Sequence, residues 1–352
     1  MKNPVTPNSV SLPKKTARAA TVVTLDQVAR LAGVSPSTVS RILNGTAVVS
    51  EIKRQSVEKA VADLGFVPNP MARGLAGGRT LSIGVITQAI DSPFYGMALS
   101  GIEQQLDQAG FSALYVSGHW DAKAEAKCIE VLRSRRVDGI IVLSGRLSDQ
   151  ALKACAKNIP VVVTGRSLKA PGLFSLNFDS FEGGRLATQH LIDQGHRHIA
   201  FVAGAPNHPD ACERFRGYRA ALESAGLVFD PELAVAGNFR EDSGLQAVNQ
   251  LVERRQKFTA LFAANDQMAF GAAVGLHRHG LRVPQDVALI GFDDLPMASY
   301  FVPPLSSIHE SAYELGCLAA NSMLQMLNAS PPTGQVPAPQ LVVRESSDCK
   351  IS

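Results

Sequence analysis

The 352-residue sequence has little cysteine, and its five cysteines show no regular spacing. They are Cys128, Cys155, Cys212, Cys317 and Cys349, an odd number without a C-x-x-C pair. Structural zinc sites and disulfide frameworks need paired, closely spaced cysteines, so this pattern argues against both and fits a reducing compartment. We expect each cysteine to be a small buried apolar residue.

Long apolar runs and catalytic signatures are also missing. No run of about 18 apolar residues is present, so the sequence predicts no membrane-spanning helix. It contains no G-x-S-x-G, G-x-G-x-x-G or G-x-x-x-x-G-K-[ST] motif, and none of its eight histidines has H-E-x-x-H spacing. These absences disfavour an enzyme. We therefore expect no catalytic residues, no metal site and no cofactor.

Basic residues are concentrated near the N-terminus, although the net charge of the chain is only +3. Residues 1–79 contain 11 Lys or Arg against 4 Asp or Glu, whereas residues 80–352 contain 23 against 27. A basic head on a mildly acidic body is typical of a protein that binds nucleic acid through one end. Residues 1–22 contain three prolines and no apolar region of a signal peptide, so we expect a flexible basic arm.

Residues 24–65 have the pattern of three short helices. Thr24 and Gln27 form a capping box at the start of the first helix, and Gly33 suits the tight break after it. The third helix is expected near residues 51–64, where apolar residues recur on one side.

The second of these helices has the features of a DNA-recognition helix. Ser35 can cap it, Pro36 fits its first turn, and Asn44-Gly45 ends it. A helix that enters the major groove must expose short or polar side chains, and Arg41 can contact guanine in a bidentate manner. An ordinary helical hairpin with solvated Ser and Thr is the alternative. The candidate phosphate contacts are Thr24, Leu25, Ser35, Thr38, Ser40 and Asn44.

From Leu81 onward, apolar runs of strand length alternate with stretches of helical length. The runs cover residues 81–86, 113–116, 139–143, 161–164, 198–202, 260–263 and 287–290, and the intervening stretches include 96–109, 122–135, 183–194 and 210–225. This alternation predicts parallel α/β sheets with helices on both faces, in two lobes. Ligands of such sheets bind beyond the carboxyl ends of the strands, which singles out residues 91–95, 165–166, 265–266 and 293–294.

Several segments resemble one family in the same order. Val23–Gly45 (VTLDQVARLAGVSPSTVSRILNG) closely resembles the head of the lactose-repressor (LacI/GalR) family of bacterial transcriptional regulators, and Pro68–Gly78 (PNPMARGLAGG) resembles its hinge. The body segments AANDQMAFGA, GLRVPQDVALIGFDD and PPLSSI follow in the order of that family. The resemblance runs from about Val23 to about Arg344, so the first 20 residues lie outside it.

The resemblance implies the architecture. The expected chain has a small all-α helix-turn-helix head and a hinge helix. A two-lobed α/β body with parallel sheets follows, similar to periplasmic binding proteins. We expect an arm at 1–22, the DNA-binding domain at 23–67, the hinge helix and linker at 68–79, the effector-binding and dimerisation body at 80–346 and a tail at 347–352. The first lobe is expected at about 80–178 plus 309–329, and the second at about 179–308 plus 330–346.

The resemblance also implies which residues touch DNA. The positions that read bases are Pro36, Ser37 and Arg41, although Pro36 offers only apolar contact, for example to a thymine methyl group. In the hinge, Leu75 matches a leucine that family members insert into the minor groove, which kinks the duplex. Asn69, Ala72 and Arg73 surround it. The alternative for Leu75 is a packing residue between domains.

The same resemblance indicates an effector site in the body. Phe94, Tyr95, Phe178 and Phe239 could supply aromatic faces, and Asp179, Arg214, Asn265 and Asp293 could supply polar groups. Arg166 lies next to a position that faces ligand in related regulators. For each, lobe packing or a loop salt bridge is the alternative. We expect Asp266 and Asp294 to cap structure, while the single tryptophan, Trp120, could line a surface or an oligomer contact.

Together these features predict a ligand-responsive, sequence-specific DNA-binding transcriptional regulator. The expected partners are palindromic double-stranded operator DNA, a second copy of the chain and a small effector, by default a sugar or sugar-derived molecule that releases a repressor. A corepressor-dependent regulator is an alternative, as are a sugar-binding transport component and a nucleotide-handling enzyme. The two arginines Arg166 and Arg214 leave room for an acidic or phosphorylated sugar.

The sequence also predicts a cellular location and an oligomeric state. Without a membrane-spanning run or signal peptide, the chain is expected in the cytoplasm, associated with the nucleoid. The tail after Asp348 is short and lacks leucine heptads, so we favour a dimer over the zipper-joined tetramer of some relatives.

Overall fold

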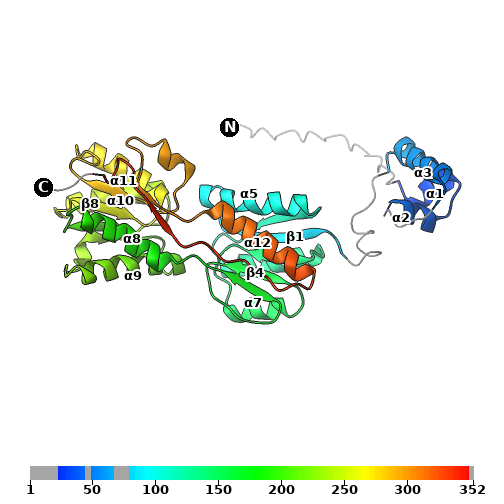
Figure 1. Ribbon diagram of the computed structural model, residues 1–352, viewed down its shortest axis with the longest axis horizontal. Helices are drawn as coiled ribbons and strands as arrows, with labels where there is room; N and C mark the ends of the chain where they lie inside the picture. The colour runs from blue at the N-terminus through cyan, green and yellow to red at the C-terminus, as the bar shows by residue number, and fades with distance from the viewer. Residues whose placement is uncertain (1–22, 44–48, 67–78, 349–352) are drawn as a thin grey trace, which may run out of the picture. The chain divides into compact units, whose positions relative to one another are not determined.

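The computed structural model describes residues 23–43, 49–66 and 79–348, which form two separate units (Figure 1). The division falls between Thr80 and Leu81. We call the described part of the first unit the head and that of the second unit the body. The predicted hinge helix at 68–79 lies almost entirely outside the described residues.

The head consists of three helices, as the sequence predicts: α1 (Leu25–Ala32), α2 (Pro36–Leu43) and α3 (Glu51–Leu64). Thr24 begins α1 with the expected capping box, in which its backbone N–H donates to Gln27 Oε1 at 2.8 Å. Gly33 ends α1 in the left-handed region at φ 65°, which glycine adopts without steric cost. The buried core contributed by these helices comprises Val28, Ala29, Ala32, Val39, Val57 and Ala60.

The first lobe of the body contains a five-stranded parallel sheet in the order β2-β1-β3-β4-β5. Its strands are β1 (Ser82–Thr87), β2 (Ser112–Ser117), β3 (Gly139–Val142), β4 (Val161–Thr164) and β5 (Leu173–Leu176). Successive side chains point to opposite faces, so both faces need cover. One face packs on α5 (Pro93–Gln108) and α12 (Ala312–Leu327), and the other on α6 (Ala122–Ser134) and α7 (Asp149–Ala156).

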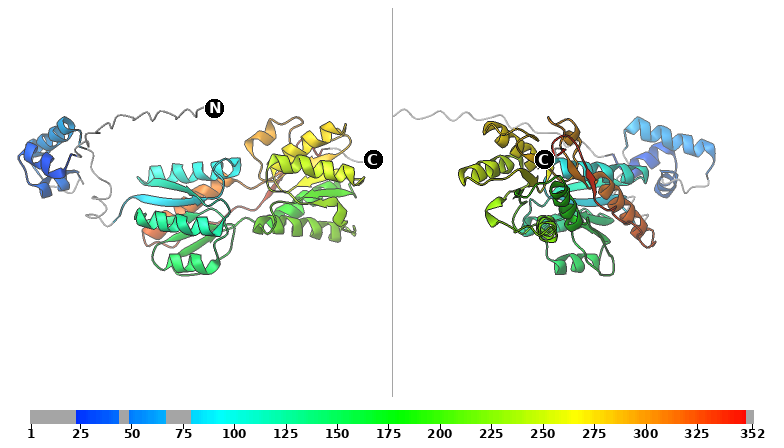
Figure 2. Two further views of the ribbon diagram at one scale, coloured as in Figure 1. Left: turned by 180° about the vertical axis from the view of Figure 1, so that it is seen from behind. Right: turned by 60° about the vertical axis from the view of Figure 1, so that its left-hand side comes forward.

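The second lobe repeats this plan with a four-stranded parallel sheet in the order β7-β6-β8-β9. The strands are β6 (Ile199–Val202), β7 (Ala234–Val235), β8 (Ala260–Ala263) and β9 (Ala288–Ile290). The covering helices are α8 (Ser180–Asp193), α9 (Pro209–Ser224), α10 (Glu241–Glu253) and α11 (Asp266–Arg278). Helix α8 packs beside α9, and α10 beside α11, on opposite sides of the sheet (Figures 1 and 2).

The chain passes between the two lobes three times (Figure 1). It leaves β5 for α8, returns after β10 (Ser307–His309) to α12, and crosses again to β11 (Gln340–Val342), which pairs antiparallel with β10. Helix α12 therefore completes the first lobe, although it follows the second lobe in sequence. Three connections in parallel restrict the relative motion of the lobes mainly to opening and closing.

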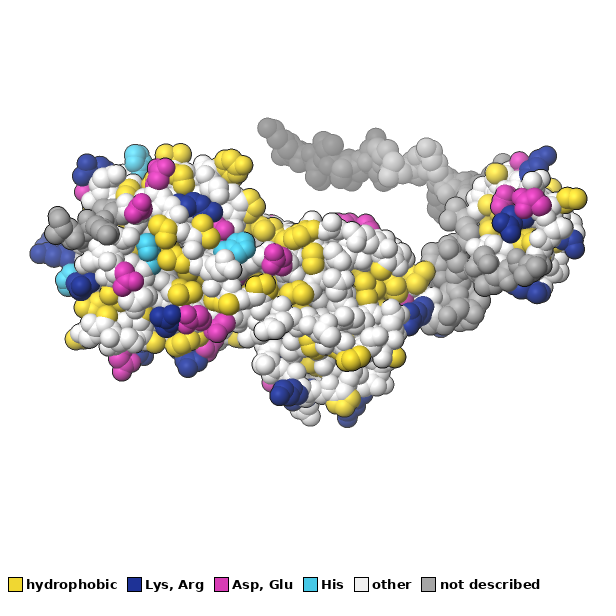
Figure 3. Space-filling model, in the orientation of Figure 1, with side chains coloured by type: hydrophobic (Ala, Val, Ile, Leu, Met, Phe, Trp, Pro, Cys, Tyr) yellow, Lys and Arg dark blue, Asp and Glu magenta, His cyan; other side chains and the backbone are white. Residues whose placement is uncertain are grey.

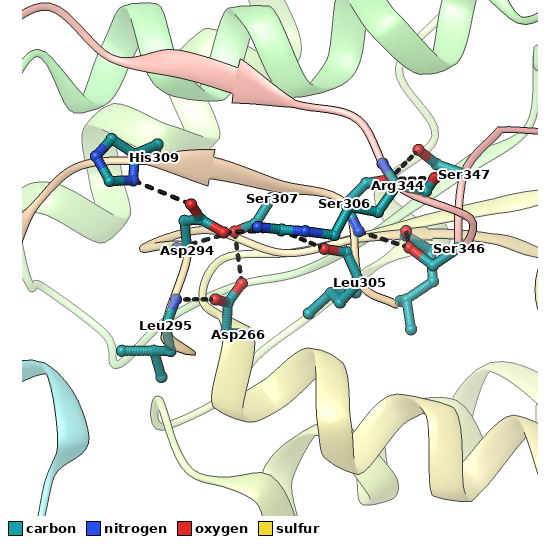
Figure 4. Close-up of polar contacts among 11 residues, drawn as sticks. Asp266, Asp294, Leu295, Leu305, Ser306, Ser307, His309, Arg344, Ser346 and Ser347 are labelled. Carbon is teal, nitrogen blue, oxygen red and sulfur yellow. Dashed lines mark hydrogen bonds and ion pairs between the residues drawn. The ribbon is translucent and has the colours of Figure 1, made fainter. Parts of the chain in front are cut away.

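A polar network anchors two of these crossovers to the second lobe (Figure 4). Asp294 forms an ion pair with Arg344 Nη1 at 2.7 Å and is hydrogen-bonded to His309 Nδ1 at 3.0 Å. Asp266 accepts a hydrogen bond from Ser307 Oγ at 2.6 Å and another from the Leu295 backbone N–H at 2.7 Å. Both aspartates therefore hold structure, as expected, but neither caps a helix: Asn265 is the N-cap of α11, and Leu295 is the N-cap of the 3-10 helix at Pro296–Ser299.

The cysteines correct one expectation. Cys155 is buried, and Cys128 and Cys317 are half-buried, but Cys212 is exposed on α9. A small apolar residue can occupy the solvent face of a helix at little cost, so exposure at this position needs no chemical role. All four of these thiols are free.

Close packing of α5 against α12 yields a stability prediction. A methyl group on Gly101 of α5 would overlap the carbonyl oxygen of Tyr313 on α12. Gly101→Ala should therefore lower the free energy of unfolding of the body by about 1–3 kcal/mol, because two backbones must separate. Thermal and urea unfolding followed by circular dichroism would measure this change.

Gly96 on the same helix provides the matched control. It is exposed, and a methyl group there meets no atom within 4 Å. Gly96→Ala should leave stability unchanged or raise it by up to about 1 kcal/mol through helix propensity. Equal unfolding midpoints for the two variants would contradict the packing argument.

Candidate functional site

The predicted base-reading residues share one exposed face of α2 in the head. Pro36, Ser37 and Arg41 are exposed, while Val39 on the opposite side is buried in the core. Ser37 and Arg41 are four residues apart, so they lie one above the other on the helix. Arg41 Nε donates to the Ser37 carbonyl oxygen at 3.3 Å. This face can present a guanidinium, a hydroxyl and an apolar ring to a groove.

Four of the predicted phosphate contacts, Thr24, Leu25, Ser35 and Thr38, lie at the N-terminal ends of α1 and α2, and Ser40 lies further along α2. Ser35 Oγ accepts a hydrogen bond from the Thr38 backbone N–H at 3.2 Å and lies 2.8 Å from Thr38 Oγ1. Leu25 and Ser40 are half-buried, whereas Thr24 is exposed. The remaining predicted DNA contacts lie outside the described residues: Asn44, Asn69, Ala72, Arg73 and Leu75.

A cavity of about 280 Å³ lies between the two lobes of the body. It is lined by Ala89, Ser92, Phe94, Tyr95, Trp120, Arg146, Ala205, His208, Asp210, Arg214, Asn238, Phe239, Arg240, Asn265, Gln267 and Asp293. These residues follow the carboxyl ends of β1, β2 and β3 in the first lobe and of β6 to β9 in the second. This is where ligands bind to open parallel sheets, so the topology itself identifies the cavity as a candidate site.

Aromatic rings form a continuous wall that passes from one lobe to the other. In the first lobe, the Phe94 and Tyr95 ring centroids lie 5.5 Å apart, and those of Tyr95 and Trp120 lie 6.3 Å apart. Trp120 then contacts His208 of the second lobe at 4.5 Å, and His208 contacts Phe239 at 5.0 Å. Such faces can cover the C–H surface of a ring-shaped ligand.

One guanidinium forms the charged floor of the cavity. Arg214 of α9 is buried, its Nη1 donates to the Ala264 carbonyl oxygen at 2.6 Å, and its Nη2 lies 3.4 Å from Asp293 Oδ1. The same Nη2 lies 3.8 Å from Glu310 Oε2, and the guanidinium carbon lies 3.6 Å from the centre of the Phe292 ring. Arg214 is thus fixed by an ion pair, a carbonyl and a cation–π contact.

The carboxyl groups around Arg214 are held in an unusual protonation state. Burial raises the pKa of Asp293 to about 7 and the pKa of Glu310 to about 8, despite the opposing effect of Arg214. Burial also raises the pKa of Asp210. These three acids surround a single guanidinium, so desolvation and mutual repulsion outweigh its attraction. Burial, with the nearby Arg214 and Arg146, lowers the pKa of His208 to about 3, so His208 is a neutral ring.

Three of the eleven non-glycine residues with a positive φ in the described part of the chain line the cavity. Trp120, Phe239 and Asp293 have φ angles of 56°, 68° and 99°, and all three line the cavity. Such conformations cost energy for residues with a Cβ atom and concentrate at ligand-binding loops.

Two contacts join the lobes at the mouth of the cavity. Arg240, which precedes α10, forms an ion pair with Asp91 in the loop after β1. Arg146, which follows β3, donates from Nη2 to the Pro206 carbonyl oxygen at 3.3 Å. Together with the Trp120–His208 ring contact, these interactions hold the cleft closed.

The structure brings six of the nine predicted effector residues into the cavity lining: Phe94, Tyr95, Arg214, Phe239, Asn265 and Asp293. The other three lie outside it. Asp179 caps α8 by accepting from the Glu182 backbone N–H at 3.0 Å, and Phe178 precedes it. Arg166 donates to the carbonyl oxygens of Leu147, at 2.6 Å, and Gly145.

Sequence reasoning did not select several lining residues, notably His208, Asp210 and Arg146. Each follows the carboxyl end of a strand, so the strand-end rule could have found them if it had been applied to β3 and β6. Trp120, whose role the sequence left open, lies in the aromatic wall.

On the face in Figure 3, basic and acidic side chains of the body are interspersed, mostly over the second lobe. Among residues 23–43, 49–66 and 79–348, no group of three or more His, Cys, Asp or Glu side chains is arranged to hold a metal ion. Within those same ranges, no helix is long and apolar enough to cross a membrane.

A helical head with an exposed reading face, followed by a two-lobed body with a ligand cleft, defines the class of ligand-responsive DNA-binding regulators. The family model described as bacterial regulatory proteins, lacI family, matches residues 24–69. The model described as periplasmic binding proteins and sugar binding domain of LacI family matches residues 80–340. The chain belongs to the LacI family.

Individual relatives agree with this assignment. The HTH-type transcriptional repressor PurR of Haemophilus influenzae is 33% identical over 332 residues, which cover 92% of this chain and 98% of that protein. The ribose operon repressor of Escherichia coli is 37% identical over 309 residues, covering 87% and 93%.

Solved structures give the same result. A crystal structure of the lac repressor dimer bound to operator and the anti-inducer ONPF has a TM-score of 0.84 and 32% identity, covering 92% of this chain and 99% of that one. The chain is therefore a DNA-binding transcriptional regulator and not an enzyme, and its body is the kind that binds small effectors.

The raised pKa values predict how stability depends on pH. Between about pH 4 and pH 8 the folded body holds protons on Asp293 and Glu310 that the unfolded chain releases. The free energy of unfolding should therefore fall as pH rises through this window, and the loss should be complete above about pH 8. Glu310→Gln removes one of these groups, so it should reduce the difference in unfolding free energy between about pH 6 and pH 9 by on the order of 2 kcal/mol.

Thermal and urea unfolding at the two pH values would test this prediction. Glu345→Gln is the matched control, because Glu345 is exposed, and it should retain the wild-type pH dependence. The assignment of raised pKa values would fail if Glu310→Gln and wild type lost the same stability on the alkaline side.

Proposed function

We propose that this protein is a transcriptional repressor whose affinity for a palindromic operator is controlled by a sugar or sugar-derived effector bound in the interlobe cavity. The observation that carries the proposal is the cavity itself, which takes its lining from both lobes of a body that follows a DNA-reading head. The relatives named as repressors support the direction of regulation. The same proposal places the protein in the cytoplasm, on the nucleoid.

Effector binding would act through the balance between open and closed lobes. A ligand that touches both the Trp120 side and the His208 side of the cleft favours the closed arrangement, and it can shift the equilibrium only by its difference in affinity for the two states. Residues 68–79 would transmit this change as a hinge that folds on DNA, with Leu75 inserted in the minor groove. By linkage, operator DNA must change effector affinity by the same factor.

The proposed functional form is a homodimer, because two symmetric heads are needed to read the two halves of a palindrome. The body has an exposed apolar surface suited to a second copy. Val302 and Tyr300 are 87% and 81% exposed in the loop after η2 (Pro296–Ser299), and a groove beside them is lined by Val274 and Phe301. Large apolar side chains at this exposure mark interaction surfaces on soluble proteins.

Selection of operator sequences from a random duplex library by the full-length protein would test the DNA-binding part. The expected product is an inverted repeat, bound more tightly than random competitor at moderate salt. If the selection enriches no sequence, either in the absence or in the presence of candidate effectors, the proposal is contradicted. Adding a responsive effector would also show its sign, since loss of binding indicates induction and gain indicates corepression.

Arg41 provides a specific prediction on the selected operator. Arg41→Ala should weaken operator binding by roughly 1–3 kcal/mol and relax base preference at one position of each half-site, because a bidentate guanine contact is lost. Lys59→Ala is the control, since it removes an exposed positive charge from α3 rather than from the reading face. Repeating the selection with both variants would measure the change. A wild-type sequence preference in Arg41→Ala would contradict the role given to this residue.

Asp293 provides the corresponding prediction for effector response. Asp293→Asn should preserve operator binding but raise the effector concentration needed for a response at least tenfold, because the carboxylate that faces both Arg214 and the cavity is lost. Asp193→Asn, an exposed carboxylate on α8, should respond as wild type does. Titration of the operator complex with effector would measure both. An unchanged midpoint in Asp293→Asn would place the effector elsewhere.

A further inference from the structure

We propose that Glu125 and Arg166 position the loop of residues 144–147, which carries Arg146 across the cleft, and thereby set how readily the two lobes close. We call these four residues the Arg146 loop. Neither Glu125 nor Arg166 lines the cavity, so both are positioning residues that act on the cleft through Arg146. The inference rests on the proposed function in one respect, because it takes closure of the cleft as the response to effector.

Glu125 binds the backbone donors of the Arg146 loop. It is fully buried on α6, and its Oε1 and Oε2 accept from the Arg146 backbone N–H at 2.8 Å and 2.9 Å. Its Oε2 also accepts from the Leu147 backbone N–H at 2.8 Å. A carboxylate removed from water needs such donors, so Glu125 and the loop hold each other in place.

Arg166 binds the backbone acceptors of the same loop. Its Nη1 donates to the Leu147 carbonyl oxygen at 2.6 Å, and its Nη2 donates to the Gly145 carbonyl oxygen. A guanidinium presents its donors in a rigid fork, which fixes the two carbonyl groups relative to each other. The Arg146 loop is therefore held through its N–H groups by one side chain and through its C=O groups by another.

Gly145 permits this arrangement. Its φ angle is 123°, a value that side-chain-bearing residues rarely adopt. A Cβ atom at this position would lie 2.6 Å from Glu125 Oε2 and 2.8 Å from Gln88 Nε2, closer than real contacts allow. The backbone of the loop thus lies directly against the buried carboxylate, and a change at Glu125 must displace the loop.

The position of the loop matters because Arg146 reaches the second lobe. Its Nη2 donates to the Pro206 carbonyl oxygen at 3.3 Å, although the Arg146 side chain is exposed. A long, exposed side chain loses rotamer freedom when its tip is bound, which offsets much of the gain from one hydrogen bond. Fixing the backbone beforehand lowers the remaining entropic cost, so Glu125 and Arg166 favour the contact and with it the closed cleft.

The consequence for regulation follows from the balance between the two states. A ligand that binds the closed cleft has an apparent affinity proportional to the fraction of protein already able to close. Loss of either positioning residue should reduce that fraction and weaken the response to effector, although the cavity lining itself is unchanged. Effector sensitivity would thus be set in part from outside the binding site.

Trp120 supplies a measurement of closure that needs no effector. It is the single tryptophan of the sequence, and its ring lies 4.5 Å from that of His208 in the other lobe. Opening of the cleft withdraws His208 and exposes the indole to solvent. Quenching of Trp120 fluorescence by acrylamide in the native full-length protein, without DNA, therefore reports the closed fraction.

Three variants test the chain of contacts. Glu125→Gln keeps the size of the side chain but turns one acceptor oxygen into a donor that faces backbone N–H groups. Arg166→Lys keeps the charge but loses the fork that spans two carbonyl groups. Arg146→Ala removes the interlobe contact itself. Each should raise the acrylamide quenching constant by about 1.5-fold or more, because a smaller fraction of the protein is closed.

Matched controls come from the exposed side of α6. Glu130→Gln and Arg133→Lys make the same chemical changes at exposed residues of that helix and should keep the wild-type quenching constant. Glu125 also packs beside Gly118, two residues before Trp120, whereas the bonds of Arg166 go to the Arg146 loop and Asp149. Arg166→Lys therefore reports on the loop alone, and it decides the test if Glu125→Gln does not fold.

A double-mutant cycle separates positioning from a purely structural role. If Arg166 acts through Arg146, Arg166→Lys should leave the quenching constant unchanged when it is added to Arg146→Ala. A purely structural role would lower the urea unfolding midpoint by the same amount in both backgrounds. It would also change native-state quenching equally in both backgrounds, or not at all.

The inference is overturned if Arg146→Ala, Arg166→Lys or a folded Glu125→Gln protein keeps the wild-type quenching constant. It is also overturned if the increase caused by Arg166→Lys persists in full beside Arg146→Ala. These results are distinct from failure of the proposed function. A protein that selects operator DNA and responds to an effector, but shows no such cycle, would retain the function and lose this inference. A protein that shows the cycle but selects no DNA would do the reverse.

Discussion

The body depends on one buried guanidinium, that of Arg214, and on how it is held. It is carried on α9, but its partners come from the ends of β8 and β9 and from the crossover that leads to α12: the Ala264 carbonyl, the Phe292 ring, Asp293 and Glu310. An isolated charge at this depth would cost several kcal/mol, and these partners offset that desolvation cost. The requirement fixes helix α9, the loops after β8 and β9, and one interlobe connection around a single point.

The surroundings of Arg214 also form the floor of the ligand cavity. Residues that line the cavity are therefore next in sequence to residues that hold the connections between the lobes. Asp293, which pairs with Arg214, is followed by Asp294, which pairs with Arg344 and His309 on the two crossovers that meet in Figure 4. Asn265 lines the cavity, and the next residue, Asp266, binds Ser307 on one of those crossovers. A ligand that rearranges hydrogen bonds on the floor therefore acts one residue away from the segments that join the lobes.

The elements that could be predicted from the sequence are those with a strong local pattern of apolar residues. The buried strands β1, β3, β4, β6, β8 and β9 coincide within a residue or two with predicted apolar runs, and α3 has the predicted bounds. Strands β5, β7, β10 and β11 were not predicted, because each contains a polar residue or a half-exposed position and none is a continuous buried apolar run. Their place is decided by pairing with distant segments, as when Ser307 meets Val342.

The candidate site shows the same limit at the level of single residues. An aspartate after a strand looks alike in the sequence whether it caps a helix, as Asp179 does, or faces a cavity, as Asp293 does. Only the assembled lobes distinguish them, because the cavity exists where seven strand ends from two sheets converge. Trp120 and His208 illustrate this point: 88 positions separate them in the sequence, yet their rings lie 4.5 Å apart across the cleft. Because the two rings belong to different lobes, opening of the cleft would separate them, so residues that sequence reasoning could not place together are well placed to respond to closure of the cleft.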